Sequence, residues 1–187
     1  MATPVAHALV GMTCLSITHI IWPRCVIPIT IYSLFCFAIL GCLPDIDLFF
    51  SYLLTGSHLT LHSGPTHSFF FAFIIAVILG LLAPHPSGHQ LKIGAMIGVA
   101  VASHVIVDWF TGRQIGFFYA HKLAPFWPFL TESFSLPITL FKGVTHGDFD
   151  VTFSWSNLKL IIYELLLFLP ILLGTLFFNY KLKLNKK

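Results

Sequence analysis

Charged residues are scarce in this chain, and their scarcity limits what it can be. Only 9% of its 187 residues are charged and 57% are hydrophobic, whereas soluble domains carry about 25% charged residues. A chain of this composition does not fold around one apolar core in water, which excludes a soluble domain. No basic patch alternates with aromatic residues, so we expect no nucleic-acid partner. The sequence is that of an integral membrane protein.

Pairs of cysteines with metal spacing are also missing. The four cysteines lie within the first 42 residues, mostly inside apolar runs, and no C-x-x-C spacing occurs. We therefore expect buried, reduced thiols and no thiolate metal site.

What the chain has in abundance is long apolar runs. Five of them, at about 5–22, 26–43, 68–83, 91–110 and 158–179, approach the ~20 residues that a helix needs to cross a bilayer. The segments WPRC and APHPSGHQ separate neighbouring runs, and their prolines break helices. The predicted fold class is all-α: a polytopic membrane protein with about five transmembrane helices, forming a single domain over residues 1–187.

The segment 111–157 differs from these runs, because it is aromatic, irregular and interrupted by proline and glycine. It is too broken for a membrane helix and too apolar for a free linker. We expect an interfacial loop or a short amphipathic segment packed over the helix ends, with Phe126, Trp127 and Trp155 at the depth of the lipid headgroups.

The distribution of lysine and arginine predicts an orientation. With five crossings, the side that holds the C-terminus carries Arg24, Lys92 and the four lysines of the tail. The cations of the other side lie in or beside one long loop, where the positive-inside rule counts less. We therefore expect a plasma-membrane or inner-membrane protein with a cytoplasmic C-terminus and an outer N-terminus.

The same topology gathers ionisable residues from all five runs at the outer face of the membrane. Burying an unpaired charge in a membrane costs several kcal/mol, so such residues are functional candidates by default. They are His7, Asp45, Asp47, His62, His67, His104, Asp108 and Glu164. The helices were placed from hydropathy alone, so this gathering is an independent indication of a site. A purely structural polar network is the alternative interpretation.

The spacing of these residues favours metal binding. His104 and Asp108 are four residues apart, so they share one helix face and can hold one ion, or a ligand and its orienting carboxylate. Asp45 and Asp47 would point the same way in extended structure. Imidazole and carboxylate ligands favour Zn²⁺, or Mn²⁺ or Fe²⁺, and we expect two or three ions. A bound water would then have a pKa of about 7 and give a hydroxide nucleophile.

The segment LHSGPTHS supplies two of the candidate ligands. Gly64 and Pro65 favour a turn that folds His62 and His67 back toward a common point. Thr66 is expected to cap the helix that follows.

These motifs together resemble the YdjM-like family of inner-membrane proteins, which are predicted metal-dependent hydrolases. The matching segments are AHALVG, LPDIDLFF, HSGPTHS, SHVIVDWFT and PFWPF, in that order. The order of ligands is also distantly similar to that of zinc-dependent phospholipase C. In two places the chain departs from the family: Leu48 replaces a histidine and Ser63 replaces an arginine. Arg113 or Lys122 is the candidate for the missing phosphate-binding cation.

The residues and the resemblance together imply a membrane-bound hydrolase of a phosphoester or ester in a lipid or lipid-linked substrate. Asp47, His67 and Asp108 are assigned catalytic roles beside their metal ligation. If a further imidazole is needed, His121 or His146 is the candidate. A metal-binding transporter or sensor and a non-catalytic scaffold stay as alternatives, although transport favours ligands near the bilayer midplane. No feature indicates an oligomeric state.

Overall fold

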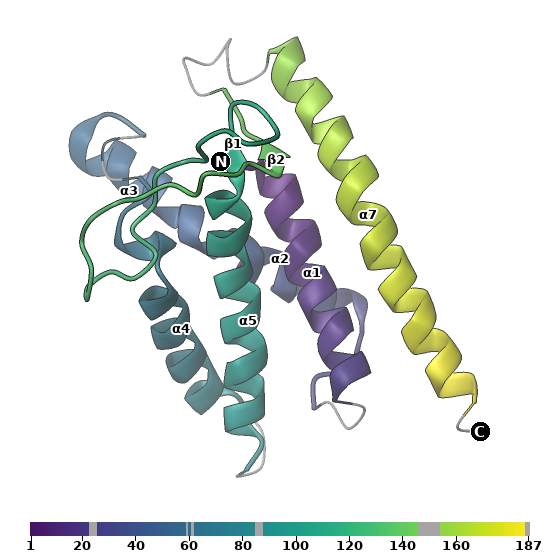
Figure 1. The fold of residues 1–187 in the computed structure, drawn as a ribbon. Coiled ribbons are helices and arrows are strands. Elements are labelled where there is room, and N and C mark those ends of the chain that lie inside the picture. Colours follow the sequence, from purple (N-terminus) through teal and green to yellow (C-terminus); the bar gives the residue numbers. More distant parts are fainter. Residues whose placement is uncertain (23–25, 59, 61, 85–87, 146–153, 186–187) are drawn as a thin grey trace.

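The structure is a computed structural model that describes residues 1–22, 26–58, 60, 62–84, 88–145 and 154–185, and it is mostly helical (Figure 1). The helices are α1 (Pro4–Ile21), α2 (Ile31–Cys42), α3 (Ile46–Thr55), α4 (Phe69–Leu82), α5 (Gln90–Trp109) and α7 (Trp155–Leu184). Short 3₁₀ turns, η1 (Leu43–Asp45) and η2 (Pro65–His67), precede α3 and α4. The strands are β1 (Thr111–Gly112) and β2 (Phe141–Lys142). The predicted all-α class is confirmed.

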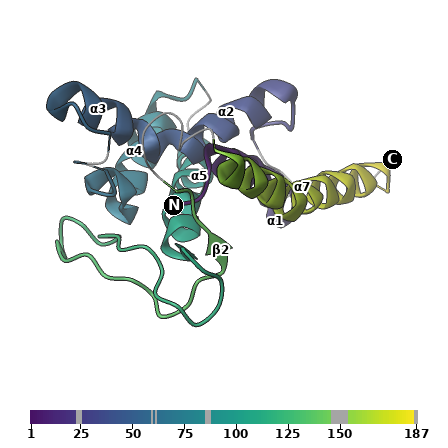
Figure 2. The same cartoon turned by 90° about the horizontal axis from the view of Figure 1, so that it is seen from above.

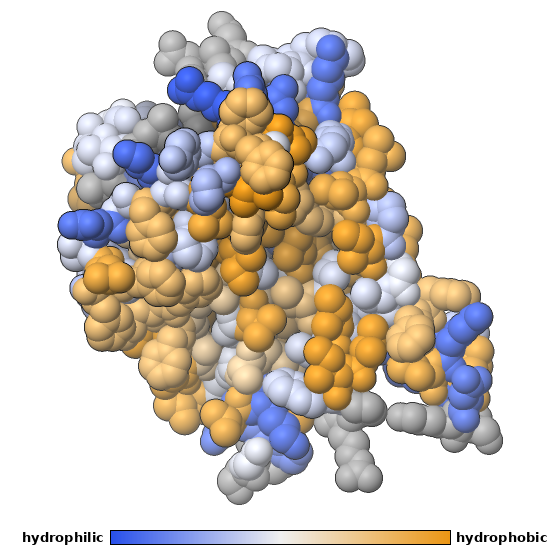
Figure 3. All heavy atoms as spheres, in the orientation of Figure 1, coloured by the Kyte–Doolittle hydropathy of each residue, from blue (hydrophilic) through white to orange (hydrophobic). Residues whose placement is uncertain are grey.

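Among the described residues, four helical segments are long and apolar enough to cross a membrane: Pro4–Ile21, Ile31–Thr55, Gln90–Trp109 and Trp155–Leu184. The apolar helix α4 is shorter, at 14 residues. Figure 3 shows an apolar band on the visible face between hydrophilic residues at its two ends, as expected for a bilayer-spanning bundle.

The second helix differs from its predicted bounds of 26–43 at both ends. It begins later, because Thr30 forms a capping box with Ser33: each side chain accepts a hydrogen bond from the other residue's backbone N–H. Beyond α2, η1 leads directly into α3, a helix that the hydropathy pattern did not predict.

The expectation for the cysteines is only partly right. Cys14 and Cys42 are half-buried, Cys36 is exposed on the apolar surface, and all three are free thiols. Cys25 lies outside the described residues.

Glycines let the helices approach backbone to backbone. A Cβ at Gly41 of α2 would lie 2.3 Å from the carbonyl oxygen of His7, and one at Gly11 of α1 would lie 2.2 Å from a carbonyl oxygen of α2. Helices α4 and α5 meet in the same way, since a Cβ at Gly80 would lie 2.8 Å from the Cα of Gly94. Small residues at such crossings are typical of membrane helices. The close crossing of α1 and α2 brings the polar end of α1 next to η1.

The segment after α5 is a folded loop at the end of the bundle that also holds the N-terminus and the start of α7 (Figure 1). Strands β1 and β2 pair in parallel, with Thr111 opposite Phe141 and Gly112 opposite Lys142. Seen from above, the loop lies on one side of α5 and the helices α2 and α3 lie on the other (Figure 2). A loop is present where an interfacial segment is expected, and its position relative to a membrane stays a prediction. It is held by a short strand pair and not by an amphipathic helix, although residues 146–153 lie outside the described part.

Aromatic side chains fasten this loop to the helix ends. Phe126 packs against Phe69 and Trp109, at ring-centroid distances of 5.9 and 6.0 Å. Trp127 lies 6.3 Å from Phe70, the next residue of α4. The loop therefore covers the ends of α4 and α5, where the candidate ligands lie.

Candidate metal centre

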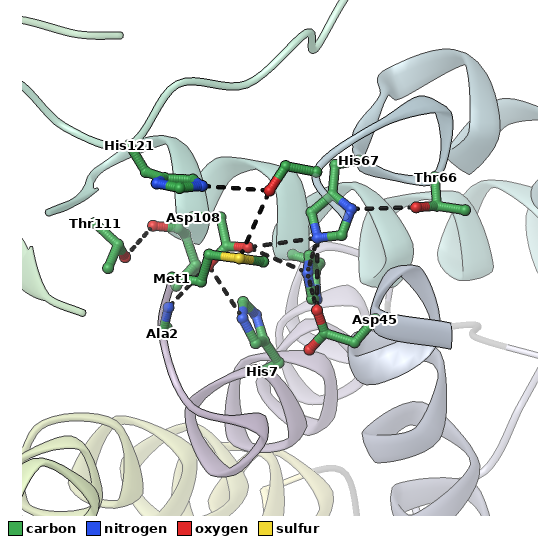
Figure 4. A network of polar contacts seen from close by, with 12 residues as sticks. Met1, Ala2, His7, Asp45, Thr66, His67, Asp108, Thr111 and His121 are labelled. Atoms are coloured by element: carbon green, nitrogen blue, oxygen red, sulfur yellow. Dashed lines mark hydrogen bonds and ion pairs between the residues drawn. The ribbon is translucent and has the colours of Figure 1, made fainter. Parts of the chain in front are cut away.

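Four side chains from η1, η2 and α5 converge on one point near the covered end of the bundle (Figure 4). They are Asp45, His67, His104 and Asp108, and one ligand atom of each lies within 4.8 Å of all the others. Nε2 of His104 is 3.1 Å from Nε2 of His67, 3.4 Å from Oδ1 of Asp45 and 3.3 Å from Oδ2 of Asp108. Nε2 of His67 is 3.5 Å and 3.7 Å from the same two oxygens. Only Asp45 is partly open to the surface, with 16% of its side chain exposed.

These separations fit ligands that share one metal ion. Tetrahedral ligands at about 2.0–2.1 Å from Zn²⁺ lie about 3.3 Å from one another, and the measured distances run from 3.1 to 3.7 Å. Oδ1 of Asp45 and Oδ2 of Asp108 are buried and have no hydrogen-bond partner among the described residues. Buried polar atoms without partners are rare in native proteins. A cation at this point would satisfy both oxygens.

Hydrogen bonds behind the two histidines aim their Nε2 atoms at the centre. His104 Nδ1 donates to the carbonyl oxygen of Gly41 at 2.8 Å, and His67 Nδ1 lies 3.1 Å from Oδ2 of Asp47. Such partners fix the tautomer and ring orientation of metal-binding imidazoles. Burial lowers the pKa of His67, but the carboxylates of Asp45 and Asp47 outweigh this effect, so the net shift is upward.

Asp45 and Asp47 do not lie as the extended backbone would place them. Both belong to helical backbone, Asp45 at the end of η1 and Asp47 in the first turn of α3. Residues two apart in a helix point to nearly opposite sides. As a result, the two carboxylates flank the ring of His67, with Asp45 on Nε2 and Asp47 on Nδ1.

His62 extends the cluster beyond Asp47. Its Nδ1 lies 2.7 Å from Oδ1 of Asp47, and Asp45, Asp47, His62 and His67 form a second group with ligand atoms within 4.8 Å of one another. Thr66 also donates its hydroxyl to Asp47, at 2.8 Å. The second group shares Asp45 and His67 with the first, so the two groups are overlapping parts of one cluster and not separate sites.

The predicted turn before α4 is present, but Thr66 does not cap the helix. The backbone N–H of His67 donates to the carbonyl of Gly64 at 3.0 Å, which closes the 3₁₀ turn. This turn separates Thr66 from α4, and Ser68 is the N-cap residue, its side chain accepting a backbone N–H of the first helical turn.

His7 lies against the back of His104. Their rings stack with centroids 3.7 Å apart, and His7 Nε2 lies 3.3 Å from Oδ1 of Asp108. Neither ring nitrogen of His7, both buried, has a hydrogen-bond partner among the described residues. His7 is outside both four-residue groups. It lies beside Oδ1 of Asp108, the carboxylate oxygen that does not face the centre.

Glu164 comes from α7 and joins the cluster only indirectly. Its carboxylate accepts hydrogen bonds from the N–H of Thr3, at 3.0 Å, and from the Thr3 hydroxyl. The neighbouring N–H of Ala2 donates to Oδ1 of Asp108 at 2.9 Å. Glu164 is in neither of the two groups, and its role as a ligand stays a prediction.

Arg113 and Lys122 lie apart from the metal ligands, in the loop above them. Both line a cavity of about 1070 Å³ together with His121 and Lys142. His121 approaches the cluster, since its Nε2 is 3.3 Å from Oγ of Ser63. His146 lies outside the described residues.

Sequence reasoning missed two groups that position the ligands. The carbonyl of Gly41 orients His104, and the N–H of Ala2 orients Asp108. Both are backbone groups, which every residue carries, so no residue type could signal them.

Comparison with known families agrees with the resemblance that the motifs indicate. The family model described as YdjM inner membrane protein matches residues 1–182, a range that includes every candidate ligand. No curated protein matches the chain, and no solved structure does.

Proposed function

Because the chain belongs to the YdjM inner membrane protein family, we propose that it is a membrane-bound, metal-dependent hydrolase. Its substrate would be a phosphoester, or a related ester, of a lipid or lipid-linked molecule. The observation that supports this most is the convergence of Asp45, His67, His104 and Asp108 at ligand-to-ligand distances suited to one ion.

The donor set favours zinc. Two imidazole nitrogens and two carboxylate oxygens, without sulfur, suit Zn²⁺ and also Mn²⁺ or Fe²⁺. When bound, such an ion supplies Lewis acidity and a water with a pKa of about 7. A second ion would share Asp45 and His67, so one ion is the simplest occupancy of the described residues.

The protein residues around the ion have separable roles. His67 and His104 hold the ion through Nε2, each fixed by a partner on Nδ1. The two carboxylate oxygens of Asp108 have different contacts. Oδ2 faces the centre, and Oδ1 faces His7 and accepts a hydrogen bond from the N–H of Ala2. Asp45 is the partly exposed ligand and marks the side from which a substrate can approach.

The location of the cluster supports a lipid substrate. The ligands lie near the end of the bundle, and aromatic residues of the covering loop pack beside them. The ester groups of membrane lipids lie at such an interface, whereas a transport site is expected near the midplane. From the distribution of lysine and arginine, this end is proposed to face away from the cytoplasm.

The test is hydrolysis of a panel of phospholipids and lipid-linked phosphates by the metal-loaded protein in mixed micelles. We expect turnover by the wild type and by His58→Ala, an exposed histidine that stacks on Tyr52. We expect His104→Ala to lose metal and at least about 10²-fold in rate, since it removes a ligand. Stoichiometric metal without turnover on any substrate of the panel would reject the proposal, and so would full activity of His104→Ala.

A further inference from the structure

The covering loop and Met1 line an open basic cavity near the metal ligands. Its volume is about 1070 Å³, slightly above the ~300–1,000 Å³ of most ligand pockets, and three cations line it: Arg113, Lys122 and Lys142. His121 also lines the cavity, and no aspartate or glutamate of the described residues contributes to the lining. The cavity is therefore a concave surface of one sign of charge.

Backbone pairing fixes the three cations around this cavity. Gly112 pairs with Lys142 in the β1–β2 ladder, which brings Arg113 next to Lys142. The N–H of His121 donates to the carbonyl of Thr111 at 2.8 Å, which brings Lys122 to the same place. The folded loop thus holds like charges together instead of letting them spread apart.

The three cations have no counterion within the described part of the chain. Each is exposed, and no carboxylate of the described residues lies within 4.0 Å of any of them; every ion pair found there joins a histidine to an aspartate. A concave site with several unpaired charges of one sign attracts a ligand of the opposite sign.

Met1 and His121, which line the cavity, also belong to the polar contact network around the metal ligands (Figure 4). Met1 lines the cavity, and its sulfur contacts Nε2 of His62. Ser63 has a left-handed backbone, with φ of 64°, and its hydroxyl lies 3.3 Å from His121 and 3.7 Å from the Met1 sulfur. Non-glycine residues rarely adopt this conformation, so the contacts with Met1 and His121 hold Ser63 in it.

A second cavity shares Lys142 with the basic cavity. It has a volume of about 460 Å³, lies at the start of α7, and is lined by Lys142, Trp155, Lys159 and Tyr163 among others. Tryptophan, tyrosine and lysine are the residues that anchor proteins at lipid headgroups. Since Lys142 lines both cavities, the basic cavity lies beside a surface that has the residue types found at lipid headgroups.

We propose that the basic cavity binds the phosphate-bearing head group of a lipid with net negative charge, through Arg113, Lys122 and Lys142. This inference rests on the proposed function and specifies its substrate class: anionic lipids in preference to zwitterionic ones. A zwitterionic head group would place its ammonium among three cations, and this repulsion discriminates against it.

Binding is measured without turnover, in the His104→Ala background, with short-chain phosphatidylglycerol and phosphatidylcholine as probes. The full-length protein is expected to bind phosphatidylglycerol at least about tenfold more tightly. The double variant Arg113→Gln/Lys142→Gln is expected to lose this preference. Lys142→Arg, which keeps the charge, and Lys183→Gln, an exposed lysine near the end of α7, are expected to retain it.

Equal affinity for the two lipids, or a preference that survives in the double variant, would overturn the inference. Inorganic phosphate is added as a competitor to identify the source of the anion. If phosphate displaces phosphatidylglycerol, the two share a phosphate site. If phosphate binds but phosphatidylglycerol is not preferred over phosphatidylcholine, the head-group assignment is overturned. Charge preference without hydrolysis by the wild type would reject only the hydrolase proposal. Hydrolysis without charge preference would reject only this inference.

Discussion

Replacing Gly41 by alanine tests how the crossing of α1 and α2 supports the metal centre. The new Cβ would lie 2.3 Å from the carbonyl oxygen of His7, and it would also lie 3.2 Å from the Cα of Gly11. Both are backbone atoms, so no side chain can rotate away to make room. Carbon and oxygen atoms approach favourably to about 3.3 Å, so the two helices must separate by about 1 Å.

That displacement acts directly on His104. Its Nδ1 lies 2.8 Å from the carbonyl oxygen of Gly41. A shift of about 1 Å away from the ring would lengthen this contact beyond hydrogen-bonding distance. Loss of such an orienting partner lowers metal affinity by about 10–100-fold, and overpacking costs about 1–3 kcal/mol of stability.

The assay is metal affinity, by competition with a chromophoric chelator, together with thermal unfolding in detergent. Gly174→Ala is the matched control, because a Cβ at Gly174 of α7 meets no atom within 4 Å. We expect Gly41→Ala to lower both the metal affinity and the unfolding temperature, and Gly174→Ala to change neither. Wild-type metal affinity in Gly41→Ala would refute the claim that this carbonyl orients His104.

Three further predictions concern the neighbours of the centre. Asp47→Asn removes the carboxylate behind His67 and should weaken metal affinity by about 10–100-fold without abolishing binding; complete loss, as expected for Asp108→Asn, would instead make Asp47 a ligand. Glu164→Gln should keep the metal but speed hydrogen exchange at the N–H of Thr3, and metal loss would show that Glu164 is a ligand. Chelation should lower the unfolding temperature, and metal restored at 100 times its Kd should return about 2.7 kcal/mol; an unfolding temperature that does not change on chelation would contradict binding to the folded state.

Much of the fold could be predicted because hydropathy directly reports membrane spans. The runs 5–22 and 91–110 differ from α1 and α5 by one residue at each end. The hydropathy pattern ended the second run at residue 43 and so missed α3. Pro44 occupies the first turn of η1, where proline is tolerated, and helical backbone continues beyond it. The pairing of β1 with β2 was also missed, since each strand has two residues and no local pattern.

Topology predicted that the candidate ligands gather at one end of the bundle, but not their geometry, and His7 and Glu164 lie outside both four-residue groups. His104 and Asp108 share a face at helical spacing, and both take part in the four-residue group. The arrangement of Asp45 and Asp47 depended on a backbone conformation that the motif alone does not specify. The enclosure of Lys142 with Arg113 depends on strand pairing between distant segments, which composition cannot reveal.

X-ray absorption spectroscopy of the purified, metal-loaded protein tests the central claim most directly. The account predicts a shell of nitrogen and oxygen ligands at about 2.0–2.1 Å that includes two imidazoles, with no sulfur at about 2.3 Å. Removing either His67 or His104 should take away one imidazole or the bound ion. A sulfur ligand in this shell would contradict metal binding by His67 and His104, and so would a spectrum that neither the His67 nor the His104 substitution changes.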